Sequence, residues 1–378
     1  MSNVFDYLEW RGDLSFDSVP FNPVDNIIFS IISYFPWDDI VPGINEKETI
    51  SFHHAVRKLM QMESKNPQIQ RLYIFKSEQE KILPVLTQAE RYKNVFLSSY
   101  VNTIDMEKQM QFSALTLKSD GCLPYLAFRG TDTTVIGWRE DFNMIFDGAV
   151  PAQIRSVEYL EKVAHKLKGK FNVGGHSKGG NLAVYSAAFC VPKIKKRIAV
   201  IYNNDAPGFS KKTTLKPQYI EIQNKIQTFI PQDSVIGLLF EHEKKYTVVK
   251  SCETGLMQHN PFSWQVSKNN MVKQDSITLT SKFFNNTLME WLDGMDHDMR
   301  HVFIDTIFEI INNTKMYSVT EFKDNWFKNA GLMIKSMNNL DKETKKKLLK
   351  IFAALFKTAK NNFTLFLKEK NSQKENKK

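Results

Sequence analysis

The sequence has few cysteines and no long apolar run. Its 378 residues include three cysteines, Cys122, Cys190 and Cys252, which lie far apart and form no CxxC pair. This spacing argues against a disulfide framework and against a cysteine zinc site, and it favours a reducing compartment. The first residues carry acids where a secretory signal has a basic start and an apolar core. We therefore expect a cytoplasmic protein.

Residues 27–37 form the most apolar early stretch. They are about half of the roughly 20 residues that cross a bilayer, and Ser30, Ser33 and Pro36 interrupt them. We predict a core helix here. The formal net charge is +10, but residues 342–378 hold twelve lysines and three glutamates, so the rest of the chain is almost neutral. Any attraction to an anionic partner is therefore expected from this basic tail.

Periodicity changes along the chain. Residues 1–100 show apolar stripes at helical spacing in 26–34, 49–62 and 78–92. From Met110 short β-rich runs begin, and strands alternate with helices up to about residue 250. The expected strands are 111–117, 123–128, 171–173, 197–202, 225–230 and 245–250, with helices at 153–167 and from Gly179. This alternation predicts a doubly wound α/β sheet.

Beyond about residue 275 the strand signals end. Helical patterns follow at 281–292, 296–313 and 319–337, and the polar residues from 371 are expected to be disordered. We divide the chain into a helical region packed on the core (1–100), an α/β core (101–270), a helical C-terminal region (271–370) and a tail (371–378).

The segment from Gly175 to Gly179 reads Gly-His-Ser-Lys-Gly and lies between an expected strand and an expected helix. In that context G-x-S-x-G forms a sharp turn that projects the serine hydroxyl. Glycines are needed on both sides, and the amides that begin the helix face developing negative charge. Ser177 is the candidate nucleophile of an α/β-hydrolase, and the Lys178 amide is one candidate oxyanion donor. A plain glycine-rich turn with a capping serine is the alternative.

A serine nucleophile needs a histidine base held by a carboxylate. In this fold the acid and the base follow the serine, which leaves His242, His259, His297 and His301. His242 lies among charged residues, and His297 and His301 lie on one helix face without the glutamate of a zinc motif. His259 has apolar neighbours and is the expected base.

Two aspartates follow strands after the serine. We expect Asp233, in Ile-Pro-Gln-Asp-Ser-Val, to be the acid, with Asp205, in Asn-Asn-Asp-Ala-Pro-Gly, as the alternative. Either could instead be a turn aspartate that bonds its own backbone. Thr131 follows an earlier strand in Phe-Arg-Gly-Thr-Asp and is the candidate second oxyanion donor.

Together the segments AFRGTD, GGHSKGGNLAVYSAA, NNDAPGF, IPQDSV and QHNPFSW resemble the ordered motifs of class 3 lipases. FDYLEWRGDLSF, PFNPVDNIIFS and GWREDFNMIF resemble a bacterial family of lipase-like hydrolases. The resemblance covers about residues 1–265. It implies Ser177 as nucleophile, Asp233 as acid, His259 as base and Thr131 at the oxyanion position. Lys178 departs from the apolar residue common after the nucleophile in class 3 lipases.

The sequence thus predicts hydrolysis of a carboxylic ester, of a lipid or an acylated small molecule, without a metal or organic cofactor. The competing hypothesis is a non-catalytic protein that keeps the fold as a membrane-associated or partner-binding module.

Apolar residues recur every three or four positions through residues 348–366, between lysines. This pattern predicts a basic amphipathic helix, which either docks on the rest of the chain or lies on an anionic membrane. We expect docking, with a peripheral membrane contact through residues 342–370 as the alternative. Binding to nucleic acid has the same charge but no supporting motif.

Overall fold

The fold is built on one central sheet. The computed structural model describes residues 2–132, 134–146, 149–241, 245–296, 298–300, 302–303, 305–306 and 341–375. Eight strands follow one another across the sheet in chain order. Their bounds are β1 Ile50–Ser51, β2 Phe96–Asp105, β3 Met110–Lys118, β4 Tyr125–Phe128, β5 Phe171–His176, β6 Ile198–Asn204, β7 Ile226–Pro231 and β8 Thr247–Val249. Pairs from β1 to β4 are antiparallel and pairs from β4 to β8 are parallel.

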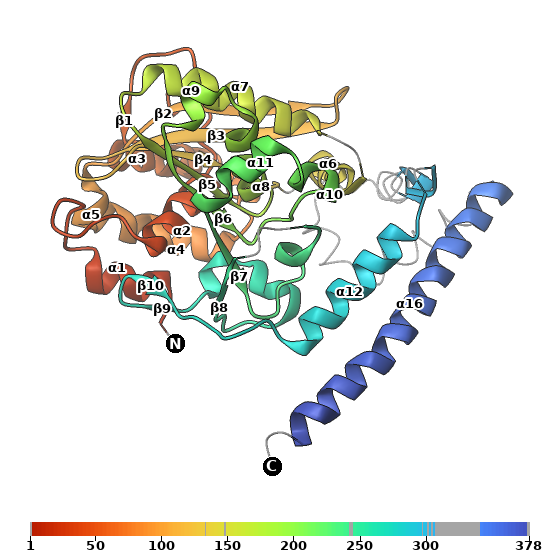
Figure 1. Ribbon diagram of the computed structural model, residues 1–378. Coiled ribbons are helices and arrows are strands. Elements are labelled where there is room, and N and C mark those ends of the chain that lie inside the picture. The colour runs from red at the N-terminus through yellow and green to blue at the C-terminus, as the bar shows by residue number, and fades with distance from the viewer. Residues whose placement is uncertain are drawn as a thin grey trace.

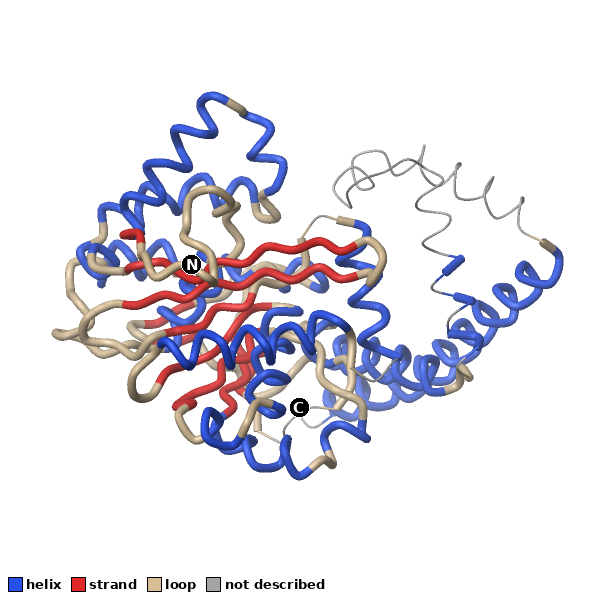
Figure 2. Tube along the Cα trace, turned by 90° about the horizontal axis from the view of Figure 1, so that it is seen from above, coloured by secondary structure: helices blue, strands red, loops and turns tan. Residues whose placement is uncertain are grey.

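Helices cover both faces of this sheet (Figures 1 and 2). One face packs against the N-terminal helices α1 (Val4–Arg11), α2 (Pro23–Ile32), α3 (Phe52–Lys65), α4 (Lys76–Gln88) and α5 (Glu90–Lys93). The other face packs mainly against α7 (Pro151–Lys166), α8 (Lys178–Phe189) and α11 (Pro217–Ile222). Short helices α9 (Pro192–Lys195) and α10 (Lys211–Thr214) lie in the connections. This layered, mostly parallel sheet confirms the expected α/β-hydrolase fold.

Helix α2 shows how the N-terminal region joins the sheet. Asn22 caps the helix, its amide donates to the Asp25 carboxylate, and Pro23 occupies the first turn. All its residues from Val24 to Ile32 are buried, so the apolar stretch is a core helix as predicted. Among the described residues, none of the helices combines the length and apolarity needed to cross a bilayer.

The expected strands and their order are confirmed, with boundary shifts of a few residues. In the part of the chain that the structure describes, four strands were not predicted: β1, β2 and a separate short pair, β9 (Val266–Ser267) and β10 (Asn270–Met271). β2 begins at Phe96, inside the region expected to be helical, and pairs with β3 along most of its length. Its sequence, FLSSYVNTID, mixes apolar and polar residues in a strand that is buried at one end and exposed at the other.

Two long helices lie in the described part of the C-terminal region. α12 (Leu279–Asp293) confirms the pattern at 281–292, and α16 (Lys342–Glu375) confirms the basic helix. α16 continues through residues 371–375, which the sequence analysis assigns to the polar tail. These positions contain no glycine or proline that would end a helix. The patterns at 307–313 and 319–337, and residues 376–378, lie outside the described residues.

α16 docks along α12, as expected, beside the sheet (Figure 1). The contact is a small cluster of buried apolar side chains that includes Trp291, Leu292, Leu348 and Ile351. The Trp291 indole nitrogen also donates to the Ile351 carbonyl over 2.9 Å.

Candidate active site

Ser177 lies in a sharp turn between β5 and α8. Its backbone has φ 58° and ψ −138°, a conformation that non-glycine residues rarely adopt. The Ser177 amide donates to the Asn204 carbonyl over 2.9 Å, which holds the turn at the carboxyl end of β6. The strain and the position between strand and helix are those of a nucleophile elbow. The predicted context of the motif is therefore confirmed.

Gly175 and Gly179 are required by close packing under this turn. A methyl carbon on Gly175 would lie 2.4 Å from the Phe128 carbonyl oxygen, and one on Gly179 would lie 2.1 Å from the same atom. The obstacle is backbone, which cannot move aside like a side chain. The elbow can pack against β4 only with glycine at both positions.

His259 reaches the same edge of the sheet from a short 3-10 helix, η4 (Gly255–His259). Its Nδ1 lies 2.7 Å from Oδ2 of Asp205, the residue that directly follows β6. A carboxylate can only accept, so Nδ1 carries the proton and Nε2 is left as an acceptor in the neutral ring. The His259 side chain is 24% exposed, whereas the Asp205 side chain is only 1% exposed.

Asp205 is fixed from two further sides. Its amide donates to the Phe229 carbonyl over 2.8 Å, and the Ser234 hydroxyl donates to its second oxygen, Oδ1, over 2.5 Å. Both carboxylate oxygens are thus hydrogen-bonded, one by His259 and one by Ser234. Such an arrangement holds the imidazole in one tautomer and one orientation.

Asp233 does not contact His259 in this structure. Its carboxylate accepts from the Gln258 amide nitrogen over 3.2 Å and from the Thr278 hydroxyl. The expectation that Asp233 partners His259 is therefore not met, and the alternative, Asp205, takes that place. The physical reason is the direction of the two chain turns: Asp205 leaves β6 next to the elbow, whereas Asp233 is one strand further away and bonds to Thr278, the N-cap of α12.

His176, which the sequence reasoning passed over, packs directly against His259. The ring centroids are 4.5 Å apart, and His176 Nε2 donates to the His259 carbonyl over 2.7 Å. The Tyr34 hydroxyl lies 2.9 Å from the other ring nitrogen, Nδ1. Burial, reinforced by nearby His259, holds the pKa of His176 well below its usual 6.5. His176 is thus neutral, and its hydrogen bond to the carbonyl positions the His259 backbone.

Comparison with known protein families bears on this geometry. A model of the Mbeg1-like family matches residues 86–309, more than half of the chain, including the elbow, Asp205 and His259. The chain belongs to the Mbeg1-like family. This family is in the lipase-like class 3 group, which indicates a lipase-like hydrolase in general terms. No curated protein matches the sequence significantly.

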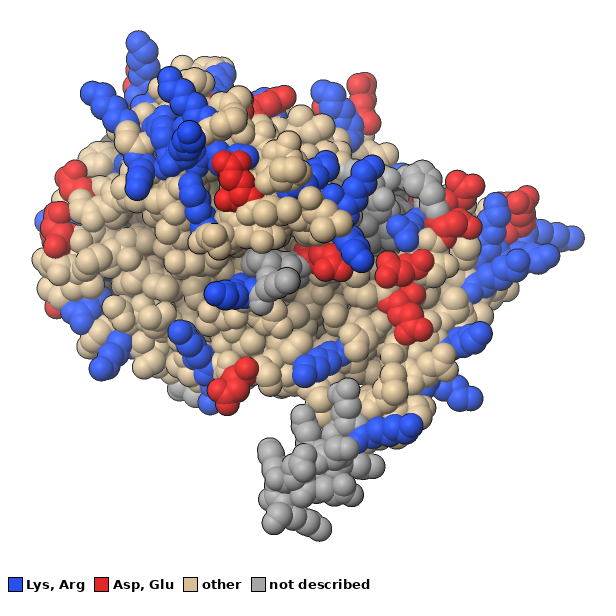
Figure 3. Space-filling model, in the orientation of Figure 1, with Lys and Arg blue, Asp and Glu red and all other residues tan. Residues whose placement is uncertain are grey.

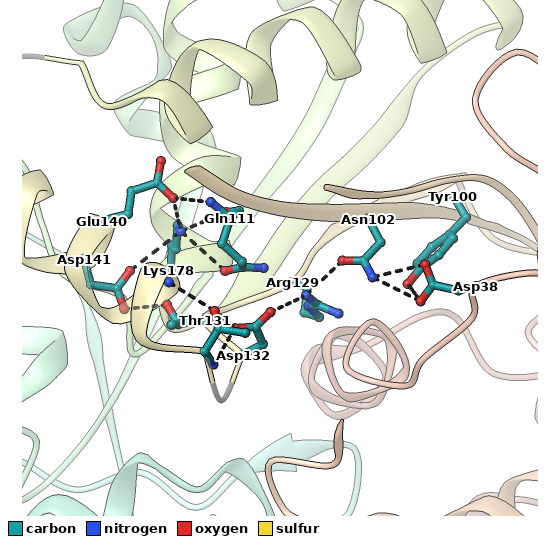
Figure 4. A network of polar contacts seen from close by, with 12 residues as sticks. Asp38, Tyr100, Asn102, Gln111, Arg129, Thr131, Asp132, Glu140, Asp141 and Lys178 are labelled. Atoms are coloured by element: carbon teal, nitrogen blue, oxygen red, sulfur yellow. Dashed lines mark hydrogen bonds and ion pairs between the residues drawn. The ribbon is translucent and has the colours of Figure 1, made fainter. Parts of the chain in front are cut away.

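Within this Mbeg1-like chain, Thr131 lies in the loop after β4, and its hydroxyl donates to Asp141 on α6 (Val135–Phe146) (Figure 4). Burial raises the pKa of Asp141 to about 6, against the opposing effects of the Lys178 ammonium and the Thr131 hydroxyl. Thr131 is therefore held by a carboxylate beside the elbow. The sequence reasoning did not single out Asp141.

The Lys178 side chain turns away from solvent into the same network (Figure 4). It is 1% exposed and donates to Glu140 over 2.5 Å and to the Gln111 carbonyl over 2.9 Å. Glu140 also accepts from the amides of Gln111 and Ala152. The lysine that departs from the class 3 pattern is thus neutralised by Glu140.

His242, His297 and His301 lie outside the described residues. In the part of the chain that the structure describes, His, Cys, Asp and Glu form no group suited to hold a metal ion. Cys122, Cys190 and Cys252 are unpaired.

Proposed function

We propose that this protein is a serine hydrolase that cleaves a carboxylic ester of a lipid or an acylated small molecule. The observation that carries the proposal is the Asp205 to His259 hydrogen bond at the sheet edge where the strained Ser177 turn lies. These are the three groups that acyl transfer through serine requires, in the chain order of this fold.

In the proposed reaction His259 Nε2 takes the Ser177 proton as Oγ attacks the ester carbonyl. The Ser177 Oγ to carbon bond forms, and the carbonyl π electrons move onto oxygen to give a tetrahedral oxyanion. The backbone amides of Lys178 and Thr131 stabilise that charge. In other enzymes each such donor contributes about 10² to 10³ in rate. Collapse breaks the ester bond, and His259 returns the proton to the leaving alcohol.

Water then hydrolyses the acyl-serine by the same steps. His259 accepts a proton from water, the hydroxyl adds to the acyl carbon, and Ser177 leaves with the proton from His259. Asp205 stabilises the imidazolium that forms in both halves. No metal or organic cofactor enters any step.

We place the reaction in the cytoplasm, because the three unpaired cysteines favour a reducing compartment.

Hydrolysis of p-nitrophenyl esters from acetate to palmitate tests the proposal. Ser177→Ala should lower kcat by up to about 10⁶, and Asp205→Asn should lower it by about 10⁴ because the wrong tautomer is favoured. Asp233→Asn is the matched control, since this carboxylate also follows a strand but contacts Gln258 and Thr278. It should change kcat by no more than a few fold.

Two results would overturn parts of this assignment. If Asp233→Asn costs as much as Asp205→Asn, the acid is not Asp205. If the wild type hydrolyses none of the esters and a fluorophosphonate does not label Ser177, the chain is a non-catalytic module with a hydrolase fold.

A further inference from the structure

Helix α16 has two apolar faces, and only one of them is covered by α12. On the covered face Leu348 and Ile351 are buried, and Phe366 packs against Phe283 with ring centroids 5.5 Å apart. Asn362 on the same face donates to Glu290 of α12 over 2.9 Å. This face accounts for the docking of the helix.

The second face is exposed. Leu349, Phe356 and Phe363 follow one another at intervals of seven residues, and Leu367 comes four residues later. Seven residues are nearly two helical turns, so these side chains form one stripe along the helix. Their exposed fractions are 58%, 73%, 50% and 43%. Phe363 lies at the border with α12, where its half-exposed ring also packs against Phe283 with centroids 6.1 Å apart. A row of large exposed apolar side chains on a soluble domain indicates an interaction surface.

Exposed lysines accompany this stripe. Lys342, Lys346, Lys350, Lys357 and Lys360 are all exposed on the same helix, and none forms an ion pair within the described residues. Lysines follow the outer edge of α16 in Figure 3. Residues 342–378 carry twelve lysines and three glutamates, whereas the rest of the chain is nearly neutral. The partner of this face must therefore be both apolar and anionic.

We propose that this lysine-flanked stripe (Leu349, Phe356, Phe363 and Leu367, with Lys346, Lys350, Lys357 and Lys360) binds the surface of a membrane that contains anionic lipid. The helix lies parallel to the membrane, its phenylalanines and leucines enter the boundary between headgroups and acyl chains, and its lysines reach lipid phosphates. Nucleic acid would satisfy the lysines but would leave the apolar stripe in water, so lipid is favoured.

The position of α12 connects this surface to the candidate active site. Thr278, which caps α12, donates to Asp233, and Ser281 donates to the Ser234 carbonyl. Ser234 in turn holds Asp205. The helical pair therefore starts at the edge of the sheet that carries the site. If the proposed function is correct, a membrane-bound α16 holds that edge close to its lipid substrate; the binding itself does not depend on catalysis.

Vesicle co-sedimentation of the full-length protein tests the surface. Vesicles of phosphatidylcholine and phosphatidylserine in equal parts are compared with phosphatidylcholine alone. The wild type should bind the mixed vesicles at least about tenfold more strongly, and added salt should weaken the binding. The double variant Leu349→Ser/Phe356→Ser and the variant with Lys346, Lys350, Lys357 and Lys360 changed to Gln should each lose about tenfold or more.

The same helix offers a matched control. Leu365 is 57% exposed, but it lies nine residues after Phe356 and so on the opposite side of α16. Leu365→Ser removes the same kind of side chain and should bind vesicles within about twofold of the wild type. Circular dichroism of each variant establishes that the helix is intact. Ser177→Ala should bind like the wild type, which separates this proposal from the catalytic one.

Three results would overturn the proposal. The first is equal binding to both kinds of vesicle. The second is a Leu349→Ser/Phe356→Ser variant that binds like Leu365→Ser, because the stripe would then play no part. The third is tight binding of a duplex oligonucleotide that the lysine variant loses and the apolar variant keeps, which would assign the face to nucleic acid.

Discussion

The N-terminal helices and the C-terminal helices are both additions to the same sheet, yet they are joined to it in different ways. The N-terminal helices share a large apolar core with one sheet face. Buried polar contacts also join them to the strands: Asn26 bonds Asn204, and Tyr34 bonds His176. α12 and α16 form a separate small apolar cluster.

A buried ion pair marks the first of these regions. Asp25 and Arg91 are both fully buried and joined over 2.6 Å, and Asp25 also accepts from the Tyr7 and Tyr92 hydroxyls. Arg91 donates its remaining hydrogens to backbone carbonyls. Both buried charges are therefore paired. Removing either partner would leave the other charge buried alone and would lower the free energy of unfolding. The comparison teaches that the N-terminal helices share the apolar core of the sheet, whereas the C-terminal pair has a small apolar cluster of its own.

The largest effect is expected from a substitution that breaks the buried ion pair of the N-terminal region. Asp25→Ala leaves the Arg91 charge buried without an anion, and we expect a loss of about 3 to 5 kcal/mol in the free energy of unfolding. Urea denaturation followed by tryptophan fluorescence measures it. Glu158→Ala removes an exposed pair with Arg155 and is the control, with an expected loss below about 1 kcal/mol. Similar losses in both variants would mean that the N-terminal helices are not held by the buried pair.

The next effect concerns the attachment. Trp291→Ala removes a buried ring and its hydrogen bond to Ile351, which should weaken the docking of α16 by about 3 kcal/mol. Hydrogen exchange should accelerate in α16 and remain unchanged in β5 and β6. Phe52→Ala, in the N-terminal core, should instead accelerate exchange in the strands. Faster exchange in β5 after Trp291→Ala would show that the two regions unfold as one unit.

The smallest effect is expected at His176, which lies between Tyr34 of the N-terminal region and His259 of the candidate site. The folded protein keeps His176 neutral, because burial lowers its pKa well below 6.5. As the pH falls below about 6.5, the unfolded chain takes up this proton first, so stability declines by up to about 1.4 kcal/mol per pH unit. His176→Gln should reduce that slope between pH 6.5 and 5.5 in urea denaturation. An unchanged slope would mean that His176 is protonated in the folded protein.

The elbow was predictable because it depends on local chemistry. Glycine, serine and glycine between a strand and a helix specify the turn at Ser177 with little help from the rest of the chain. His259 was found by elimination among four histidines. Both predictions rest on short segments whose residues have strong conformational or chemical preferences.

The acid was not predictable in the same way. Asp205 and Asp233 both follow parallel strands, and nothing local distinguishes them. The choice depends on which chain turn faces η4, and that is a property of the assembled sheet. The partner of Lys178 was equally hidden, because Glu140 lies 38 residues away in the sequence, on a helix that packs against β3. β2 was missed because its exposed end carries polar residues.

The carbonyl of Phe128 has a consequence for reading related sequences. It leaves no room for a methyl group at Gly175 or Gly179, whether or not the serine between them reacts. A related protein that had lost its activity would still need both glycines for the turn to pack against β4. In such a set of sequences, conserved glycines would indicate only that the fold is kept. Ser177, Asp205 and His259 would be the positions that could be substituted after catalytic activity was lost.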